Sequence, residues 1–367
     1  MNFSKNSLNT YLKQALDLIF KLTKDNGFWD EQENKIIRAL NYEVTKEDQI
    51  VWSPDNSIEW RYAPFALMGV MQWRDSNISN NIYDQKIKSE LNYFVEKIQN
   101  EQVPSQMPSY GIGPLILSFS LAYKMFHNEL YKDVAQNLYD YSIKKNDFNN
   151  SEDSLLLYGW CFLYEIKKDD NLRNDINRVL EDVIKKQNKK GLFIFENPTT
   201  RKHQNQMYTL LGVGKAIKVL NRREYLVNIE RTLNYTIKHR MLKNGAFIWE
   251  DLPLLKRLKS KLICKIKNVT PYWELLFECH QTFFGNAVFQ YYKAGGKKDY
   301  NKHIRLAIDW IFGNNILHKN LVEISSIGIP MRMISIKGNL DIEEQKFKGA
   351  YEVGSWITAL TNWMTFF

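Results

Sequence analysis

A chain of 367 residues, 44% hydrophobic and 14% aromatic, is long enough to bury a large core and too apolar to be disordered. A formal net charge of +9 suits an anionic partner, although dispersed lysines are only a weak signal for one. The cysteines, Cys161, Cys264 and Cys279, form neither a CxxC pair nor a disulfide framework, which indicates a reducing compartment and argues against a structural zinc site.

The same features bear on location and partners. The N-terminal segment MNFSKNSLNTYLKQALDLIFKL is interrupted by polar residues every few positions, unlike the core of a signal peptide, and no apolar run reaches membrane-spanning length. We therefore expect a cytoplasmic protein. We also expect no cofactor and no metal ion. Because the basic residues are mostly dispersed and match no known module, we expect no nucleic-acid partner either.

Apolar residues spaced three and four apart predict twelve helices along the chain. No convincing run of alternating strand residues competes with them, although the connections have room for short β pieces. In chain order, the predicted helices span 7–25, 57–75, 83–100, 110–127, 129–145, 151–167, 170–188, 203–220, 222–242, 272–294, 298–313 and 351–367.

Glycine divides these helices into two sets. An interior glycine costs about 1 kcal/mol relative to alanine, so its repeated use indicates helices that approach one another closely. The alternate helices lack glycine, apart from Gly313 at a predicted cap, and carry more charge, which predicts a solvated outer layer. The glycines of the predicted inner helices are Gly69, Gly111, Gly113, Gly159, Gly212, Gly214, Gly285 and Gly354.

The connections favour a closed ring. Three segments that lead from outer to inner helices, DNGFWDEQ (25–32), KKGLFIFENP (189–198) and KNGAFIWEDLP (243–253), place a glycine before aromatic residues and an acidic residue. Connections from inner to outer helices are short. The pattern predicts an all-α (α/α)6 toroid, a single domain over 1–367 in which the last helix packs against the first; an open helical solenoid is the alternative.

This architecture resembles the (α/α)6 toroids of carbohydrate-active proteins, which include six-hairpin glycosidases, sugar epimerases and polysaccharide lyases. The segments GLFIFENPT…YTLLGVGKAI and PSYGIGPLILSFSLAYKMF also resemble the helical domain of glucuronyl epimerases, whose β domains are absent here. Lanthionine cyclases and prenyltransferase-like toroids share the architecture, but their zinc-ligand patterns are missing. The resemblance implies a central cleft lined by the N-terminal ends of the inner helices.

Polar and aromatic residues gather at those helix ends. The segment ECHQTFF is the most unusual, because it places three polar groups in an otherwise aromatic helix, where burial without partners is costly. The predicted catalytic residues are His203, Tyr208, Glu278, His280 and Glu352. The predicted substrate-binding residues are Glu59, Trp60, Arg61, Tyr62, Tyr110, Gln204, Gln281, Arg332, Tyr351 and Trp356. A role in the core is the alternative for His280 and for several of the aromatic residues.

Two reaction classes stay open. A hydrolase needs two carboxylates, for which Glu278 and Glu352 are the best pair and Glu59 a reserve. A uronate epimerase or lyase needs a base, from His203, His280 or Tyr110, and a cation, Arg61 or Arg332, for the developing charge. Our interpretation is an enzyme acting on an anionic, uronate-containing glycan, as in bacterial surface polysaccharide metabolism. A non-catalytic glycan- or protein-binding toroid is the alternative.

A basic segment, LPLLKRLKSKLICKIKNVTPYW, interrupts the pattern at 252–273. Leucines and isoleucines recur there at three- and four-residue spacing, as in a basic amphipathic helix, which can lie on an anionic membrane at the inner face. Packing on the toroid with a solvated lysine face and capture of an acidic polysaccharide are the alternatives. The six basic residues are Lys256, Arg257, Lys259, Lys261, Lys265 and Lys267.

Overall fold

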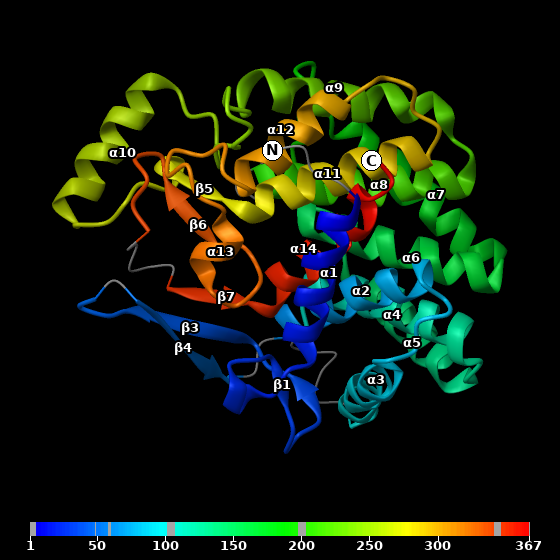
Figure 1. Ribbon diagram of the computed structural model, residues 1–367. Helices are drawn as coiled ribbons and strands as arrows, with labels where there is room; N and C mark the ends of the chain where they lie inside the picture. Colours follow the sequence, from blue (N-terminus) through cyan, green and yellow to red (C-terminus); the bar gives the residue numbers. More distant parts are fainter. Residues whose placement is uncertain are drawn as a thin grey trace.

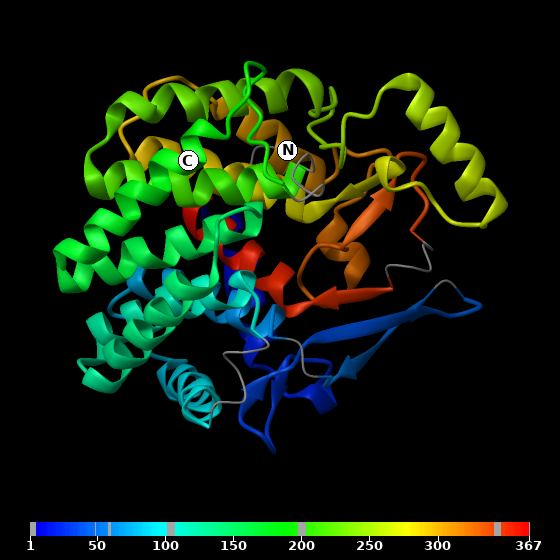
Figure 2. The ribbon, with the colours of Figure 1, turned by 180° about the vertical axis from the view of Figure 1, so that it is seen from behind.

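The computed structural model describes residues 5–47, 49–57, 60–100, 107–196, 203–340 and 346–366. Over these residues the chain forms a ring of inner helices surrounded by outer helices, with small sheets at one end (Figures 1 and 2). The predicted (α/α)6 toroid is confirmed.

The inner ring is closed. Each of its helices packs against the next one along the chain, and the last packs against the first. Closure excludes the open solenoid. The six inner helices are α2 (Tyr62–Ser76), α4 (Ser109–Phe126), α6 (Ser154–Lys167), α8 (His203–Leu220), α11 (Glu278–Lys293) and α14 (Ala350–Trp363).

The outer helices are the charged, glycine-free set. Each buries one apolar stripe, as α7 does with Leu172, Ile176, Val179, Leu180 and Val183. The first outer helix packs against α14, as predicted. These helices are α1 (Lys5–Phe20), α3 (Asp84–Gln99), α5 (Glu129–Lys145), α7 (Asp170–Lys185), α9 (Leu226–His239) and α12 (Asn301–Ile311). The short helix α13 (Leu321–Ser325) follows α12 in the chain.

Short antiparallel strands occupy the long connections, in three sheets with the orders β1-β2, β4-β3-β7 and β5-β6. They account for two wrong helix boundaries. The helix predicted from 57 begins at Tyr62, because the preceding residues pair as a hairpin, and the helix predicted from 272 begins at Glu278, because a 3-10 turn and a strand precede it. The strands are β1 (Trp29–Asp30), β2 (Lys35–Ile36), β3 (Ala39–Val44), β4 (Ile50–Asp55), β5 (Leu275–Phe277), β6 (Met333–Ser335) and β7 (Phe347–Gly349).

Two of the three glycine–aromatic connections share one structure, with an antiparallel bridge and a glycine at positive φ, whereas the first has a parallel bridge. Each forms one isolated β-bridge, between Leu22 and Trp29, Gln187 and Phe193, or Met241 and Phe247. Gly191 and Gly245 have φ of +90° and +95°, a conformation that residues with a side chain rarely adopt. The aromatic residue of each bridge is buried.

Glycines set the spacing between the inner helices. Where α2 meets α14, an added Cβ on Gly69 would lie 2.3 Å from the Gly354 carbonyl oxygen, and one on Gly354 would lie 2.3 Å from that of Phe65. Between α4 and α6, a Cβ on Gly159 would lie 2.4 Å from the Gly113 oxygen. The inner helices therefore touch backbone to backbone, as their glycine content predicts.

The helix α10 (Leu254–Ile266) is inserted between α9 and α11 and stands away from the body of the molecule in both views (Figures 1 and 2). Among the described residues, no helix is both long and apolar enough to cross a bilayer.

The ring contact can be tested with Gly354→Ala. The added methyl group would meet the backbone of α2, which cannot rotate away, so we expect the free energy of unfolding to fall by at least about 2 kcal/mol. Chemical denaturation measures this fall. Gln85→Ala, on the exposed face of α3, is the control and should change stability by less than about 0.5 kcal/mol. Equal stability of both variants would contradict a backbone-tight ring.

Candidate functional site

Strands carry charged residues to the N-terminal ends of two inner helices. β5 leads directly into Glu278, the first residue of α11, and β7 leads directly into α14. Phe277 of β5 pairs with Met333 of β6, and the Glu278 N–H donates to the Arg332 carbonyl at 3.0 Å. This backbone pairing fixes an acidic and a basic residue side by side at the end of the ring where the inner helices begin. We call this end the mouth.

Four charges meet there: Glu278, Lys348, Arg332 and Glu352, which we name the four-charge cluster. Lys348 donates to Glu278, and both side chains are fully buried. Arg332 Nε donates to Glu352 Oε1 at 2.6 Å, and the other Glu352 oxygen accepts from the Gly349 N–H at 2.9 Å. The predicted carboxylate pair is therefore brought together, with a cation bound to each member.

The two carboxylates differ in their surroundings. Burial raises the pKa of Glu278 above its usual range, and the nearby Glu352 charge adds to the rise, whereas Lys348 opposes it. One Glu278 oxygen, Oε2, has no hydrogen-bond partner among the described residues. Glu352 instead accepts on both oxygens, including a bond of 3.0 Å from the Tyr351 hydroxyl. Glu352 is held as an acceptor, whereas Glu278 keeps one oxygen available.

A tyrosine cluster lies beside these charges. The hydroxyls of Tyr110 and Tyr208 are 2.9 Å apart, and Gln204 donates to Tyr208. The Tyr110 ring stacks on Phe65 at 4.9 Å and meets Tyr351 edge-on at 6.4 Å. Burial raises the pKa of Tyr110 and Tyr208 well above 10, so both stay protonated. Both are placed as hydrogen-bonding groups, and a role of Tyr110 as a base stays a prediction.

His203 and His280 form a buried pair whose ring centroids are 4.8 Å apart. His203 Nε2 lies 3.1 Å from the His280 carbonyl oxygen, and His280 Nδ1 lies 3.4 Å from that of Phe247. A carbonyl only accepts, so these two nitrogens carry the hydrogens. The other ring nitrogens, His203 Nδ1 and His280 Nε2, bear lone pairs and have no partner among the described residues.

Both imidazoles are neutral at physiological pH. Burial lowers the pKa of His280 to about 3, and burial, together with the charge of nearby Arg240, lowers the pKa of His203 well below its usual range. Trp249 and Phe277 cover His280, with centroids 5.2 Å from its ring in each case, and Phe247 stacks on His203 at 4.6 Å. The arrangement offers two unprotonated basic nitrogens in an apolar setting.

The remaining predicted residues are divided between the mouth and the core. Arg61 is exposed just before α2, while Tyr62 is half-buried with its ring 5.0 Å from that of Tyr351. Trp60 packs on the outer-helix residue Phe94 at 6.2 Å, to one side of the cluster. Glu59 lies outside the described residues.

Two predicted binding residues do not reach the mouth. Trp356 is fully buried against Phe312 and Trp363, which makes it a core residue and corrects its assignment to substrate binding. The Gln281 side-chain amide is buried against the backbone carbonyls of the preceding turn, and its nitrogen lies 3.0 Å from the backbone carbonyl oxygen of Glu278. The hydrogen bonds of this amide are therefore made within the first turn of its own helix.

Sequence reasoning missed Lys348 and Phe347. Phe347 lies 3.8 Å from the Arg332 guanidinium, in cation–π contact, and forms part of the half-buried surface of the mouth. The segment FKGAYEVGSW held a clue to both residues. Phe347 and Lys348 are adjacent, so in a strand they point to opposite faces. Recognising it required the pairing of β7 with β3, which joins residues about 300 positions apart.

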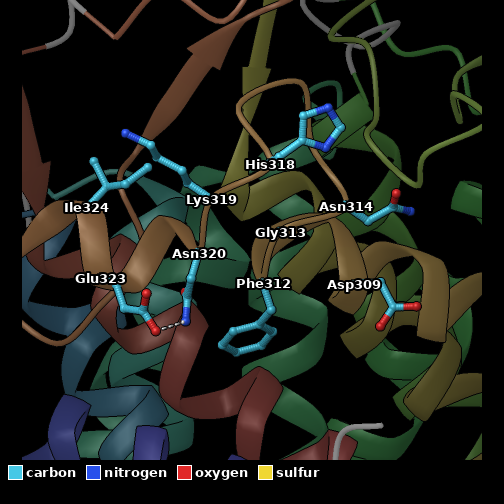
Figure 3. A pocket seen from close by; sticks show the side chains of 9 residues that line it. All are labelled: Asp309, Phe312, Gly313, Asn314, His318, Lys319, Asn320, Glu323 and Ile324. Carbon is cyan, nitrogen blue, oxygen red and sulfur yellow. Dashed lines mark hydrogen bonds between the residues drawn. The ribbon is translucent and has the colours of Figure 1, made fainter. Parts of the chain in front are cut away.

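A hollow lies elsewhere, between the end of α12 and α13 (Figure 3). It measures about 840 Å³ and is lined by Asp309, Phe312, Gly313, Asn314, His318, Lys319, Asn320, Glu323 and Ile324. None of the predicted site residues lines it, and Glu323 is engaged by Asn320 at 3.0 Å. Within the described ranges, no group of three His, Cys, Asp or Glu side chains is placed to hold a metal ion.

Solved structures with the same fold include proteins named for sugar chemistry. A cellobiose 2-epimerase from Bacillus thermoamylovorans has a TM-score of 0.66 and 11% identity, covering 98% of this chain and 99% of the other. An α-1,6-mannanase from Salegentibacter sp. has a TM-score of 0.64 and 10% identity, covering 99% of each chain. A mutant unsaturated glucuronyl hydrolase from Streptococcus agalactiae has a TM-score of 0.66 and 10% identity, covering 99% and 92%.

These similarities define the class of protein by its fold, the six-hairpin glycosidase-like (α/α)6 toroid, and they extend over nearly the whole chain. The resemblance inferred from the sequence is confirmed at that level. No protein-family model and no curated protein matches the chain.

The buried Glu278–Lys348 pair predicts a strong non-additive effect on stability. Glu278→Gln and Lys348→Met should each lower the free energy of unfolding by about 3–5 kcal/mol, because each leaves a charge buried without its partner. The combination of Glu278→Gln with Lys348→Met should cost clearly less than the sum of the two single changes. Urea unfolding of the variants measures this. Additive losses would contradict the pairing.

The neutral histidine pair predicts a loss of stability in acid. The unfolded chain protonates both histidines near pH 6.5, whereas the folded chain keeps them neutral to lower pH, so the free energy of unfolding falls as the pH drops from about 6.5 towards 3. Each histidine contributes at most roughly 1.4 kcal/mol per pH unit. Urea unfolding across this range should show a shallower slope for His280→Gln. The exposed His318→Gln should keep the wild-type slope.

Proposed function

We propose that this protein is a carbohydrate-active enzyme that binds a glycan at the mouth of the toroid and reacts by proton transfer at a sugar carbon, as an epimerase or lyase does. The observation that carries the proposal is the contrast between its candidate bases. Both glutamates are bound to cations, whereas His203 and His280 are neutral and each keeps an unpartnered basic nitrogen. A general base needs a nitrogen within reach of the proton that it removes and a pKa near the operating pH, so the pair would act only once movement of its covering side chains relieves the burial that lowers its pKa.

The surface of the mouth suits a sugar. Phe347 and Tyr62 are half-buried aromatic side chains that match the apolar face of a pyranose, and Gln204 is half-buried beside Tyr208, able to bond sugar hydroxyls. Arg332 lies at the same opening, where a uronate carboxylate would share its guanidinium with Glu352. These features support an anionic glycan as the substrate class.

The histidines are covered in this structure, so the reaction requires the covering side chains to move. Trp249 and Phe277 lie over His280, and Trp249 belongs to the long connection that precedes α10. Displacement of the Trp249 connection would expose the pair to the mouth. The sugar-acting names among proteins of this fold, an epimerase and two hydrolases, support a glycan as the substrate without selecting the reaction.

A glycoside hydrolase is the second candidate. Glu278 and Glu352 lie in one cluster, and the pKa of Glu278 is raised, as a general acid requires. The ion pairs with Lys348 and Arg332 weigh against it, because a carboxylate held by a buried cation is a poor proton donor.

Solvent deuterium exchange separates these reactions. Uronate and neutral oligosaccharides incubated with the protein in D2O should gain deuterium at a ring carbon, observed by NMR, if a base removes that proton. His280→Gln should reduce the exchange rate at least about a hundredfold, the usual contribution of a general base, while binding is retained. The matched control His303→Gln, on the outer helix α12, should exchange as the wild type does.

The other outcomes identify the alternatives. Release of new reducing ends without deuterium at carbon would assign the protein to the hydrolases, with loss in Glu278→Gln. Glycan binding with neither reaction across the panel would favour the binding toroid. Either result overturns the proton-transfer proposal.

A further inference from the structure

The basic helix α10 exposes its apolar residues to solvent. None of its residues is buried, and no other described helix or strand packs extensively against it. Leu255, Ile266 and Leu262 are 81%, 78% and 62% exposed, and Leu254, Leu258 and Ile263 are exposed as well. A soluble helix normally turns such residues towards a core, so this face has no partner within the chain.

The helix meets the rest of the protein through its other side. Arg257, Ser260 and Cys264 are half-buried, and these positions recur at three and four residues, on one side of the helix. The Arg257 guanidinium lies 5.9 Å from the Trp273 ring. Packing on the toroid through the leucines, one of the alternatives drawn from the sequence, is therefore wrong: the leucines point outwards.

Charge surrounds the apolar stripe. Leu254, Leu258, Leu262 and Ile266 repeat every four residues and form one row along the helix. The stretch from Leu254 to Lys267 contains six basic residues and no acidic one. A row of leucines among lysines fits a surface that offers both hydrocarbon and negative charge, which is what an anionic lipid bilayer presents.

The position of α10 relates it to the candidate site. The helix lies in a connection from an outer to an inner helix, at the mouth end of the ring, and the two ends of this connection meet where Trp249 packs on Tyr272 at 5.9 Å. Trp249 also covers His280. A surface bound by α10 therefore lies at the same end of the molecule as the mouth.

We propose that α10 docks this protein on an anionic membrane surface, with the leucine row among the acyl chains, the lysines at the headgroups and the mouth of the toroid at the membrane-facing end. The docking is peripheral and reversible, since one short amphipathic helix lies in the interface without crossing it. The inference is independent of the reaction proposed above, because it depends on α10 alone.

Vesicle co-sedimentation tests the docking. The wild-type protein should bind vesicles of phosphatidylcholine with about 30% phosphatidylglycerol, bind pure phosphatidylcholine weakly, and detach as the salt rises from about 0.1 M to about 1 M. Lys256→Glu/Lys259→Glu/Lys261→Glu should reduce partitioning at least about a hundredfold, since each basic residue near an anionic surface contributes roughly a factor of five. Leu258→Ser/Leu262→Ser should also release the protein, because it removes the inserted side chains.

Matched controls guard against a general charge effect and misfolding. Lys144→Glu/Lys145→Glu/Lys297→Glu makes the same change in net charge at exposed positions away from α10 and should leave most of the binding intact. The α10 variants should keep the wild-type thermal midpoint, because no α10 residue is buried. Equal binding by the wild type and the α10 lysine variant would overturn the proposal.

Two further results would assign the helix to another partner. If the leucine variant binds vesicles like the wild type and soluble acidic polysaccharide displaces both, α10 captures a polyanion and the membrane proposal fails. If light scattering shows a dimer without vesicles that the leucine variant abolishes, and the wild type does not bind vesicles, the leucine row is a contact between copies of this chain.

Discussion

Backbone contact between inner helices is the constraint on which the rest of this structure depends. Gly69 and Gly354 face each other where α2 meets α14, so the ring closes at a distance that no Cβ would allow. Gly113 and Gly159 keep the same spacing between α4 and α6. A ring this tight fills its own centre with side chains, and polar chemistry is left to the ends of the helices, where the long connections meet.

The mouth balances the cost of burying charge with pairing. Two carboxylates in the first turns of α11 and α14 meet two cations, Lys348 of β7 and Arg332 just before β6, and each charge has an opposite partner. Such pairs contribute little net stability compared with apolar residues of the same size, yet removing one member is costly. Their value is therefore positional, since they fix Arg332 and Phe347 at the opening, beside a tyrosine cluster whose hydroxyls stay protonated.

The side chain that covers His280 and the helix α10 belong to the same connection of the chain. Trp249 covers His280 on one side, and the connection then continues through α10 to β5, which delivers Glu278. A partner that binds the exposed leucines of α10 therefore acts on a segment that also covers the candidate bases. This links the two proposals physically, although each is tested by its own measurement.

The sequence by itself determined the helices, the alternation of inner and outer layers and the closed toroid, because apolar period and glycine content are local consequences of helix packing. It also indicated ECHQTFF and the segment around Glu352 as unusual, since buried polar residues are visible in an apolar pattern. Only the tertiary structure decided which partners those residues have. Lys348 meets Glu278 from 70 positions away, Trp356 turns into the core, and the leucines of α10 face outwards. Strand register and helix orientation depend on contacts between residues far apart in the chain, which no local pattern encodes.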